Sequence, residues 1–446
     1  MSTFPANLFF GSRFAVLGLG RNGLAAARAL LAMGADVEAW DDSQAARDAA
    51  HDVKLRNFGD GDFAFDALVM SPGIPHLLPR PHPTAVRARA AGVPIFADAE
   101  LLFQAVRRAG SRARFAGITG TNGKSTTTAL LAHILSVAGI PVAAGANLGT
   151  AALALPLLPD DGVYVLEMSS YMLERLATLR FDAAAMLNLS PDHIDRHGDM
   201  AGYAAAKRHV FDRQQAGDLA VVGADDAESH AMAAALRAGP ARIVTVSGRV
   251  GPTDDWPHML SAAPALPGTH NAQNAAAAYV MARHFGVVHD IIACGFASFP
   301  GLPHRQQRLR TIDGVTFIND SKATNADSVA CALSCYDRVV WIAGGQAKQG
   351  GIEPLARFFP RIARAFLIGR DAPILSATLA AHNVPHDTVG TLEAATAAAA
   401  ATARATGTPV VLLSPACASW DQFTGFEQRG DWFADLVATL AQERAA

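Results

Sequence analysis

The feature that most constrains the fold is an alternation, kept up along the whole chain, of short apolar runs with longer alanine-rich stretches. Short apolar runs suit buried strands and the alanine-rich stretches suit helices, so the pattern predicts βαβ units with parallel sheets. The runs fall into three successive sets. They lie at 14–17, 37–40 and 68–70, then at 115–119, 163–166, 183–189 and 219–222, and finally at 315–318, 339–343, 365–368 and 410–413.

The length agrees with three domains, because 446 residues divide into about three units of roughly 150. We predict an α/β protein with a Rossmann-like domain over 1–105, a central P-loop domain with a parallel sheet over 106–300, and a C-terminal Rossmann-like domain over 301–446. The basic stretch 107–114 is a candidate linker, and 395–405 should be an ordinary packed helix.

Composition excludes several classes of protein. The formal net charge of −3 removes the general electrostatic case for binding nucleic acid or an anionic membrane. The four cysteines (Cys294, Cys331, Cys335 and Cys417) contain no Cys-x-x-Cys pair, which favours reduced thiols in a cytoplasmic protein. Residues 136–159 are uncharged, but prolines, glycines and Asn147 interrupt them, so we expect a loop between buried elements and no membrane insertion.

The first motif is Gly-Leu-Gly-Arg-Asn-Gly at 18–23, directly after a strand and before a helical pattern, with Asp41 ending the next strand. Glycines let the backbone approach a diphosphate, and the helix N-terminus faces it. Three interpretations stay open at this point: an NAD-type oxidoreductase, a turn that needs glycine for packing, and a site for another nucleotide diphosphate. The Ser-Pro-Gly triplet at 71–73 could wall the same crevice.

The second motif is Thr-Gly-Thr-Asn-Gly-Lys-Ser-Thr at 119–126, between a strand and a helical stretch. The strict P-loop pattern fails at Ile118, where a glycine is expected, but the working parts are present. Gly120 and Gly123 free the loop to point N–H groups at phosphates, Lys124 reaches the β- and γ-phosphates, and Ser125 can hold Mg²⁺. The alternative is an ordinary polar turn.

Carboxylates and an imidazole follow neighbouring strands. Glu167 ends the run at 163–166, and Asp192, His193 and Asp195 follow the run at 183–189. Ligands of α/β proteins bind at the carboxyl ends of strands, so these groups suit a metal-assisted phosphoryl transfer. Taken alone, a histidine after a strand is more often a surface or capping residue.

Polar loops follow three strands of the third domain. They contain Asn319 to Asn325, then Gly344, Gly345 and Lys348, then Ser414 to Ser419, while His304-Arg305 precedes them. Each could be an ordinary connection, but three on one sheet edge predict a site. No histidine stands near Cys417 in the sequence, so we do not expect a cysteine nucleophile.

Together these strings resemble the Mur ligases. The resemblance rests on Gly-Thr-Asn-Gly-Lys-Ser at 120–125, Glu-Met-Ser-Ser at 167–170, Asp-His-Ile-Asp-Arg at 192–196, His-Asn-Ala-Gln-Asn at 270–274, Leu-Pro-His-Arg at 302–305, Asn-Asp-Ser-Lys-Ala-Thr-Asn at 319–325 and 414–422. It covers all three domains in order. It implies that the first domain holds UDP instead of NAD. It also implies ATP-dependent addition of D-glutamate to UDP-N-acetylmuramoyl-L-alanine through an acyl phosphate, in peptidoglycan precursor synthesis.

The resemblance implies a role for each matching residue. ATP is assigned to Gly120, Thr121, Asn122, Gly123, Lys124, Ser125, Thr126, Asn271, Asn274, Arg305 and Asp320. The UDP-sugar is assigned to Gly20, Arg21, Asn22, Gly23, Asp41, Ser71, Gly73 and Asn147. The incoming glutamate is assigned to Lys322, Thr324, Lys348, Ser419 and Phe426. Two Mg²⁺ sites, which Mn²⁺ may also fill, are assigned to Ser125, Glu167, His193 and Lys207 as a carbamate. The expected catalytic residues are Lys124, Glu167, His193 and Lys207.

Some features leave alternatives. Gln306, Gln307 and Trp420 depart from the family pattern, and Trp420 adjoins the expected glutamate pocket, so L-glutamate remains an alternative substrate. Without the resemblance, Lys207 would be interpreted as a solvated helix lysine beside Arg208. An NAD-dependent oxidoreductase leaves the P-loop unexplained, and a folylpolyglutamate-type enzyme leaves the first glycine-rich motif unexplained. A non-catalytic relative should have lost Lys124, Glu167 or His193. We expect a monomer whose third domain closes on its substrates by a hinge.

Overall fold

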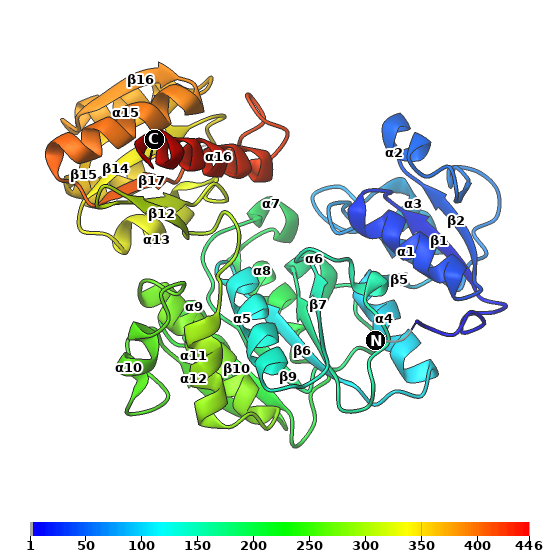
Figure 1. Ribbon diagram of the computed structural model, residues 1–446. Coiled ribbons are helices and arrows are strands. Elements are labelled where there is room, and N and C mark those ends of the chain that lie inside the picture. The colour runs from blue at the N-terminus through cyan, green and yellow to red at the C-terminus, as the bar shows by residue number, and fades with distance from the viewer. Residues whose placement is uncertain (1–2, 349, 446) are drawn as a thin grey trace. The chain divides into compact units, whose positions relative to one another are not determined.

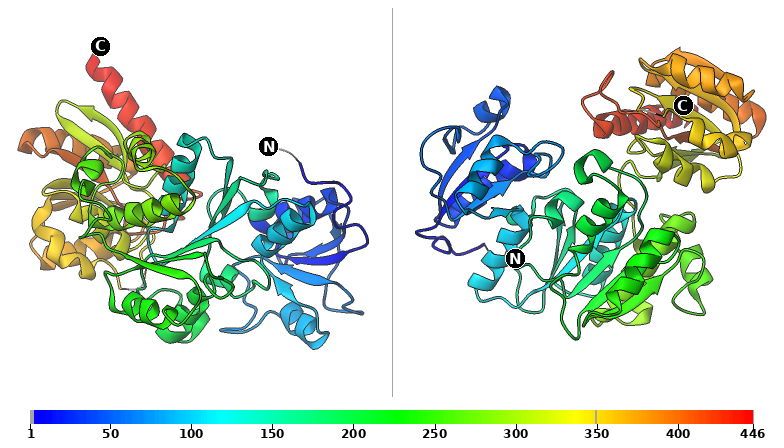
Figure 2. Two further views of the ribbon diagram at one scale, coloured as in Figure 1. Left: turned by 90° about the horizontal axis from the view of Figure 1, so that it is seen from below. Right: turned by 180° about the vertical axis from the view of Figure 1, so that it is seen from behind.

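The computed structural model describes residues 3–348 and 350–445 (Figure 1). Within these residues the strands form three sheets, and the helices lie against their faces (Figure 2). The predicted α/β class with largely parallel sheets is therefore confirmed. The chain divides into two compact units, Met1–Ala262 with Asn271–Ser298 and Ala263–His270 with Phe299–Ala446, each described by itself below. The three predicted domain ranges stay a prediction, and residues 1–2 and 446 at their ends lie outside the described part.

The first sheet has the order β3-β2-β1-β4-β5 and is parallel throughout. Its strands are β1 (Arg13–Leu17), β2 (Asp36–Trp40), β3 (Lys54–Leu55), β4 (Ala67–Met70) and β5 (Ile95–Phe96). Its helices are α1 (Arg21–Ala32), α2 (Gln44–Asp48), α3 (Pro83–Ala90) and α4 (Asp98–Arg108). Side chains along each strand point alternately to the two faces of the sheet. Because the strands are buried on both sides, a separate apolar cluster covers each face.

The second sheet has the order β11-β10-β9-β6-β8-β7 and is also parallel. Its strands are β6 (Arg114–Thr119), β7 (Val142–Ala146), β8 (Val163–Glu167), β9 (Ala183–Met186), β10 (Leu219–Gly223) and β11 (Arg242–Val246). In this sheet β8 and β7 lie on one side of β6, and β9 lies on its other side. The carboxyl end of β6 is therefore a topological switch point, where α/β proteins bind ligands.

The helices of this central region surround the sheet. They are α5 (Lys124–Val137), η1 (Ala152–Ala154), α6 (Ser170–Leu173), α7 (Ile194–His197), α8 (Met200–Arg208), α9 (Ala227–Leu236), α10 (Trp256–Ser261), α11 (Thr269–His284) and α12 (His289–Ser298). Helix α5 packs on β7, β8 and α12, so it is clamped on both sides. This packing fixes the direction of the helix whose first residue is Lys124.

The third sheet has the order β12-β13-β17-β14-β15-β16, with β12 antiparallel to β13 and the remaining pairs parallel. Its strands are β12 (Gln307–Ile312), β13 (Val315–Asn319), β14 (Val339–Gly344), β15 (Ile362–Ile368), β16 (His386–Gly390) and β17 (Val410–Leu413). Its helices are α13 (Ala326–Ser334), η2 (Glu353–Arg361), α14 (Ala372–Ala381), α15 (Leu392–Thr406) and α16 (Phe426–Ala445). One apolar cluster lies on each face.

Three expectations about local structure were wrong. The predicted linker 107–114 begins inside α4, and Arg107 caps the following turn by donating to the carbonyls of Ser111 and Ala113 at 2.9 Å each. The uncharged segment 136–159 is no plain loop, since it contains β7 and η1. The strand expected over 183–189 ends at Met186, because the residues after it turn to brace the P-loop.

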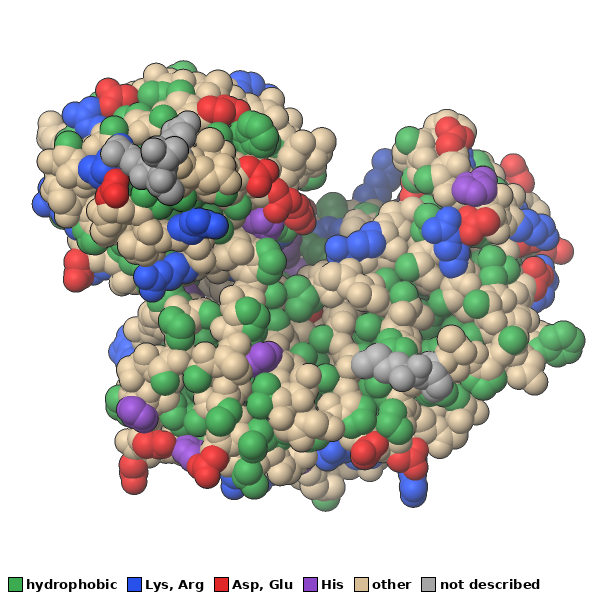
Figure 3. All heavy atoms as spheres, in the orientation of Figure 1, with side chains coloured by type: hydrophobic (Ala, Val, Ile, Leu, Met, Phe, Trp, Pro, Cys, Tyr) green, Lys and Arg blue, Asp and Glu red, His purple; other side chains and the backbone are tan. Residues whose placement is uncertain are grey.

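One expectation about local structure was confirmed. The alanine-rich segment forms part of α15, and its buried face packs on the third sheet. The four cysteines are unpaired in the structure. In the described residues no helix is both long and apolar enough to span a bilayer. Figure 3 shows acidic and basic side chains interspersed on the face in view, in line with the small net charge.

Candidate active site

The P-loop connects β6 to α5, as the sequence predicts. Gly120 and Gly123 have φ of 145° and 86°, values that side chains other than glycine rarely allow. Lys124 folds back over the loop, and its Nζ donates to the carbonyls of Gly120 at 3.0 Å and Thr121 at 2.8 Å. These hydrogen bonds shape the loop, and its lysine occupies the first position of the helix.

Two neighbouring elements brace this loop. Asn188, just beyond β9, accepts from the N–H of Asn122 at 2.8 Å and donates to its carbonyl at 3.1 Å. On the other side, a Cβ on Gly123 would lie 2.1 Å from Oδ1 of Asn274, so glycine is required by packing as well as by φ. Asn274 also donates to Asn271 at 3.1 Å, and both amides are buried. These two predicted ATP residues thus lie on α11 directly against the P-loop.

Lys207 is buried, which contradicts the interpretation as a solvated surface lysine. Its residue exposure is 2%, and its Nζ donates to the carbonyl of Gly120 at 2.8 Å and lies 4.5 Å from the centre of the Tyr203 ring. Burial, reinforced by the positive charge of Lys124, holds the pKa of the Lys207 ammonium well below its usual value. These surroundings favour the neutral amine, which is the form that reacts with CO₂.

Glu167 meets the requirements of a magnesium ligand. It ends β8 beside β6, is 3% exposed, and accepts from Asn147 through Oε1 at 2.6 Å. Its other oxygen, Oε2, is buried and has no hydrogen-bond partner. Buried carboxylate oxygens are rarely left unsatisfied without a reason such as a missing ion. Among the described residues no cluster of three or more His, Cys, Asp or Glu could hold a metal unaided. Any ion here therefore needs further oxygens from bound phosphate, as Mg²⁺ commonly has.

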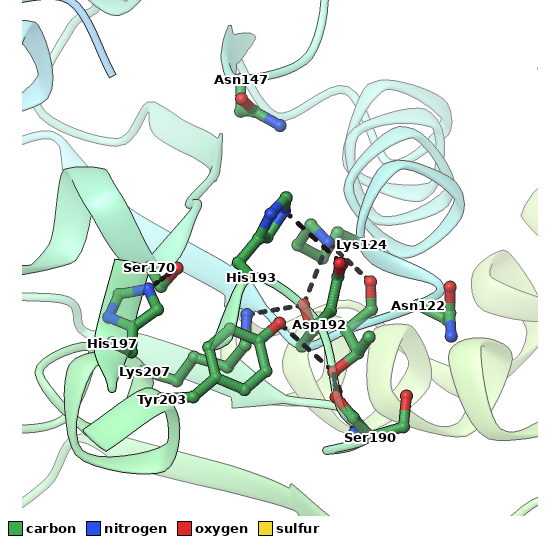
Figure 4. Close-up of polar contacts among 12 residues, drawn as sticks. Asn122, Lys124, Asn147, Ser170, Ser190, Asp192, His193, His197, Tyr203 and Lys207 are labelled. Atoms are coloured by element: carbon green, nitrogen blue, oxygen red, sulfur yellow. Dashed lines mark hydrogen bonds and ion pairs between the residues drawn. The ribbon is translucent and has the colours of Figure 1, made fainter. Parts of the chain in front are cut away.

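A cavity of about 290 Å³ lies beside Lys124 and Lys207. Figure 4 shows several of the side chains that line it. Its lining residues are Pro72, Gly73, Lys124, Asn147, Ser169, Ser170, Tyr171, Asp192, His193, Tyr203 and Lys207. His193 stands at the N-terminus of α7 with φ of 53°, and its Nε2 lies 3.5 Å from Asp192. Burial lowers the pKa of His193. The positive charges of Lys124 and Lys207 lower it further, whereas the negative charge of Asp192 raises it. A neutral imidazole, the form that binds metals, is favoured.

The first glycine motif occupies the turn between β1 and α1, as predicted. A Cβ on Gly23 would lie 1.7 Å from the carbonyl oxygen of Gly18, so the turn cannot close with a larger residue. Asp41 shapes the loop by accepting from the N–H of Leu19 at 2.6 Å and of Ser43 at 2.8 Å. Asn22 donates to the carbonyl of Ala146 at 3.3 Å, next to Asn147. The motif thus lies close to the part of the central sheet that lines the cavity.

The buried Arg175 was missed by the sequence analysis. It is 2% exposed and donates to the carbonyls of Met70, Ser71 and Pro72 at 2.9–3.2 Å. It thereby fastens the loop that contains Gly73 to the helix α6 beside the cavity. Burial lowers the pKa of Arg175 to about 10. In sequence it is one arginine after a short helix, and nothing local marks it.

In the second unit the three polar loops meet at one edge, as predicted. Asp320 accepts from the Ser414 hydroxyl at 2.7 Å, and Gln346 pairs with Ala418 across the edge. Burial raises the pKa of Asp320 to about 7. The ammonium of Lys322 lies 3.7 Å from the centre of the Phe426 ring. The other residues of the predicted set differ in exposure: Ser419 is buried, Arg305 and Thr324 are half-buried, and Lys348 and Trp420 are exposed.

Arg429, also missed from sequence, joins all three loops. It is 1% exposed and donates to Ser321 after β13, to Gly344 at the end of β14 and to Cys417 after β17. Its positive charge is buried among carbonyl oxygens, and burial lowers the pKa of Arg429 to about 10. One guanidinium with several donors in a fixed plane can satisfy three loops at once, which lysine cannot.

We predict that Arg429→Met lowers the free energy of unfolding by about 1.5–3 kcal/mol, because charged hydrogen bonds are lost and buried carbonyls stay unsatisfied. Chemical denaturation measures this change. Arg310→Met, at an exposed position of β12, is the control and should stay within about 0.5 kcal/mol of the parent. Equal stability of the Arg429 variant and the parent would contradict the bridging role.

Comparison with known proteins defines the class. A model of the Mur ligase middle domain matches residues 118–258. The fold is similar to that of UDP-N-acetylmuramate-alanine ligase from Thermotoga maritima, with a TM-score of 0.57 at 16% identity, covering 96% of this chain and 99% of that one. A pseudomurein peptide ligase type C from Methanothermus fervidus gives a TM-score of 0.55 at 17% identity, covering 96% and 100%. The fold is therefore that of the Mur ligases.

Sequence relatives narrow the assignment. UDP-N-acetylmuramoylalanine--D-glutamate ligase from Paramagnetospirillum magneticum is 50% identical, covering 98% of this chain and 99% of the relative. The enzymes of the same name from Rhodospirillum rubrum and Caulobacter vibrioides are 50% and 44% identical, with at least 98% of each chain covered. The chain belongs to the Mur ligases, within the family of UDP-N-acetylmuramoylalanine--D-glutamate ligases. The resemblance in its motifs is confirmed, and the protein is an ATP-dependent ligase acting on small molecules.

Proposed function

We propose that the protein joins D-glutamate to UDP-N-acetylmuramoyl-L-alanine at the expense of ATP, in the synthesis of peptidoglycan precursors. The observation that carries this proposal is that one cavity is lined by Lys124 of the P-loop, by His193 and Lys207, and by Gly73 and Asn147 from the expected UDP-sugar set. The P-loop and residues of the expected UDP-sugar set line the same cavity. This arrangement suits transfer of a phosphoryl group from ATP to a carboxylate of the substrate. The names of the sequence relatives support the choice of D-glutamate.

A carboxylate has no good leaving group. It is a poor acceptor of amines until phosphorylation gives it a leaving group. Lys124 would stabilise the charge that spreads over the transferring phosphoryl oxygens. The acyl phosphate would then be attacked by the amino group of glutamate, and phosphate would leave from the tetrahedral intermediate.

Magnesium fits the oxygen atoms found here. Ser125 and the unsatisfied Oε2 of Glu167 would hold one ion together with the nucleotide phosphates, and His193 with a carbamylated Lys207 would hold a second. Bound Mg²⁺ supplies charge neutralisation for the phosphates during transfer. The carbamate forms when the neutral Nζ of Lys207 attacks CO₂ and loses a proton, which turns a repelled cation into an oxygen ligand.

The remaining assignments are proposals of the same kind. The predicted UDP-sugar residues would bind substrate in domain 1–105 and at Asn147, and domain 106–300 would bind ATP with Asn271 and Asn274. Domain 301–446 would add Arg305 and Asp320 for ATP and the predicted glutamate residues. We also propose a cytoplasmic monomer, a proposal supported by the cysteines, whose unpaired thiols suit a reducing compartment.

The deciding experiment is phosphate release from ATP by the purified protein. Release should require UDP-N-acetylmuramoyl-L-alanine and D-glutamate together, and L-glutamate should not replace the D-isomer. Equal or faster release with L-glutamate would assign the other stereoisomer. Tight NADH binding seen by fluorescence would support the oxidoreductase interpretation instead.

We predict that Asp41→Ala raises KM for the UDP-sugar while leaving the affinity for ATP nearly unchanged. Asp41 holds the N–H of Leu19 inside the first glycine motif, and that loop is remote in sequence from the P-loop. Steady-state kinetics with each substrate varied in turn measures the two effects. Asp52→Ala, which removes an exposed ion pair with Arg28 in the same domain, is the matched control. A parallel loss of ATP affinity in Asp41→Ala would place this loop elsewhere in the mechanism.

A further inference from the structure

A carboxylate, an imidazole and a hydroxyl form a continuous chain that ends at the cavity. Oε1 of Glu174 lies 3.3 Å from Nδ1 of His197, and Nε2 of His197 lies 2.9 Å from Oγ of Ser170. Ser170 lines the cavity together with Lys124, His193 and Lys207, whereas His197 lies behind it. Figure 4 shows Ser170 beside His197. None of these three residues has a role in the function proposed above.

The surroundings fix the position of the His197 ring. Its side chain is 1% exposed. Tyr171 of α6 stacks on the ring at 5.6 Å with an interplanar angle of 14°, and Tyr203 of α8 contacts it at 5.4 Å. Held this way, the imidazole can neither rotate freely nor exchange its partners for water.

The charges fix which nitrogen carries the proton. Burial alone would raise the pKa of Glu174, but the hydrogen bond from His197, with the nearby charges of His197, His76 and Arg175, lowers it. Glu174 is therefore a carboxylate that accepts the Nδ1 proton. With the proton on Nδ1, Nε2 of His197 is the acceptor, and the Ser170 hydroxyl donates to it. The lone pairs of Oγ are left to face the cavity.

The proposed function leaves one proton without an acceptor. An amine that attacks an acyl phosphate must lose a proton as the C–N bond forms. In that mechanism the imidazole of His193 and the carbamate of Lys207 are assigned to magnesium, and binding to the cation weakens both as bases. Asp192 is about half exposed and lies beside His193. The Ser170 hydroxyl, by contrast, is backed by a base that is protected from solvent.

We propose that Ser170, backed by His197 and Glu174, accepts the proton of the attacking amine. This inference rests on the proposed function. As the C–N bond forms, the N–H bond breaks toward Oγ of Ser170, and the Ser170 hydroxyl proton passes to Nε2 of His197. Phosphate leaves with the electron pair of the C–O bond. The imidazolium is stabilised by the Glu174 carboxylate, the arrangement by which a carboxylate–histidine pair activates a hydroxyl in other enzymes.

The test separates the two half-reactions. In the absence of glutamate, formation of the acyl phosphate is measured by scrambling of ¹⁸O between the bridging and non-bridging positions of ATP, with UDP-N-acetylmuramoyl-L-alanine present. Ser170→Ala should leave this scrambling within about threefold of the parent and lower glutamate-dependent phosphate release about 10²–10³-fold, within the range of general-base catalysis. Hydroxylamine, which is largely unprotonated at neutral pH, should still trap the acyl phosphate at nearly the parent rate.

A second variant distinguishes a proton relay from a structural strap. Glu174→Gln keeps the size of the side chain but removes the charge that fixes the His197 tautomer, and it should show the same split.

The matched control is Ser229→Ala. Ser229 of α9 is likewise buried, and its hydroxyl donates to Asp226 at 2.8 Å. It does not line the cavity. Its loss should leave both half-reactions unchanged. Equal losses of scrambling and transfer in Ser170→Ala, full turnover of that variant, or failure of both relay variants to fold would overturn the proposal. Absence of scrambling in the parent protein would instead overturn the proposed function.

Discussion

Replacing Lys207 by alanine should reduce turnover to the detection limit, and short carboxylic acids should restore part of it. The side chain is buried beside the P-loop, and its surroundings favour the neutral amine. A neutral amine is a poor ligand for Mg²⁺ and an ammonium repels it, whereas a carbamate supplies two oxygens to this hard cation. Added acetate or formate can enter the space left by alanine and supply similar oxygens. Phosphate release measured over a series of acid concentrations tests both effects.

The control for this variant is Arg208→Ala, at the exposed neighbouring position of α8, which should keep full activity. ¹³C NMR of the parent protein in labelled bicarbonate should also show a carbamate signal that Lys207→Ala lacks. Full activity of Lys207→Ala without added acid would refute the metal-binding role. Severe loss of activity with no rescue and no carbamate signal would leave Lys207 as a buried structural residue.

Lys124→Ala should lower kcat about 10²–10³-fold, the usual cost of losing one electrostatic contact to a developing charge. Nζ of Lys124 already lies over the loop, bonded to the carbonyls of Gly120 and Thr121, so it is in place to transfer these contacts to phosphate oxygens. Rapid-quench measurement of the acyl phosphate isolates the affected step. Lys124→Arg keeps the charge but changes its reach, and it should recover only part of the rate.

Binding of ATP must be measured separately, because Lys124 also shapes the loop. Titration with a fluorescent ATP analogue should show a much smaller loss of affinity than of kcat. Lys54→Ala, which removes an exposed lysine paired with Glu38 in the first domain, is the charge-matched control. Near-normal kcat in Lys124→Ala would exclude this loop from phosphoryl transfer.

Central strands of the fold were predictable because their signal is local. Strands such as β1, β8 and β17 are buried on both faces and read as continuous apolar runs. Edge strands were missed for the converse reason. The sequence of β16 is His-Asp-Thr-Val-Gly, and half-exposed positions at the end of a sheet need little apolar character. Their strand structure comes from pairing with β15, which no local pattern contains.

The same division runs through the candidate site. The sequence predicted Gly120, Gly123, Lys124 and Glu167. Each is required by a tight turn or a strand end, and such a feature is visible within a few neighbouring residues. Arg175, His197 and Arg429 were not predictable, because each acts on partners that are distant in the chain or shows its role only through burial. Arg175, for example, binds carbonyls more than 100 residues away.

The sequence by itself determined the order of the sheets along the chain, the two glycine-rich turns and the positions of the polar strand ends, since backbone sterics and hydrophobic periodicity act over short distances. Only the tertiary structure decided the chemical state of the side chains. Lys207 has the same sequence context whether it is solvated or buried. The preference of Lys207 for the neutral amine and the orientation of the Ser170 hydroxyl depend on burial and on groups from other elements. These surroundings arise only when the elements pack together.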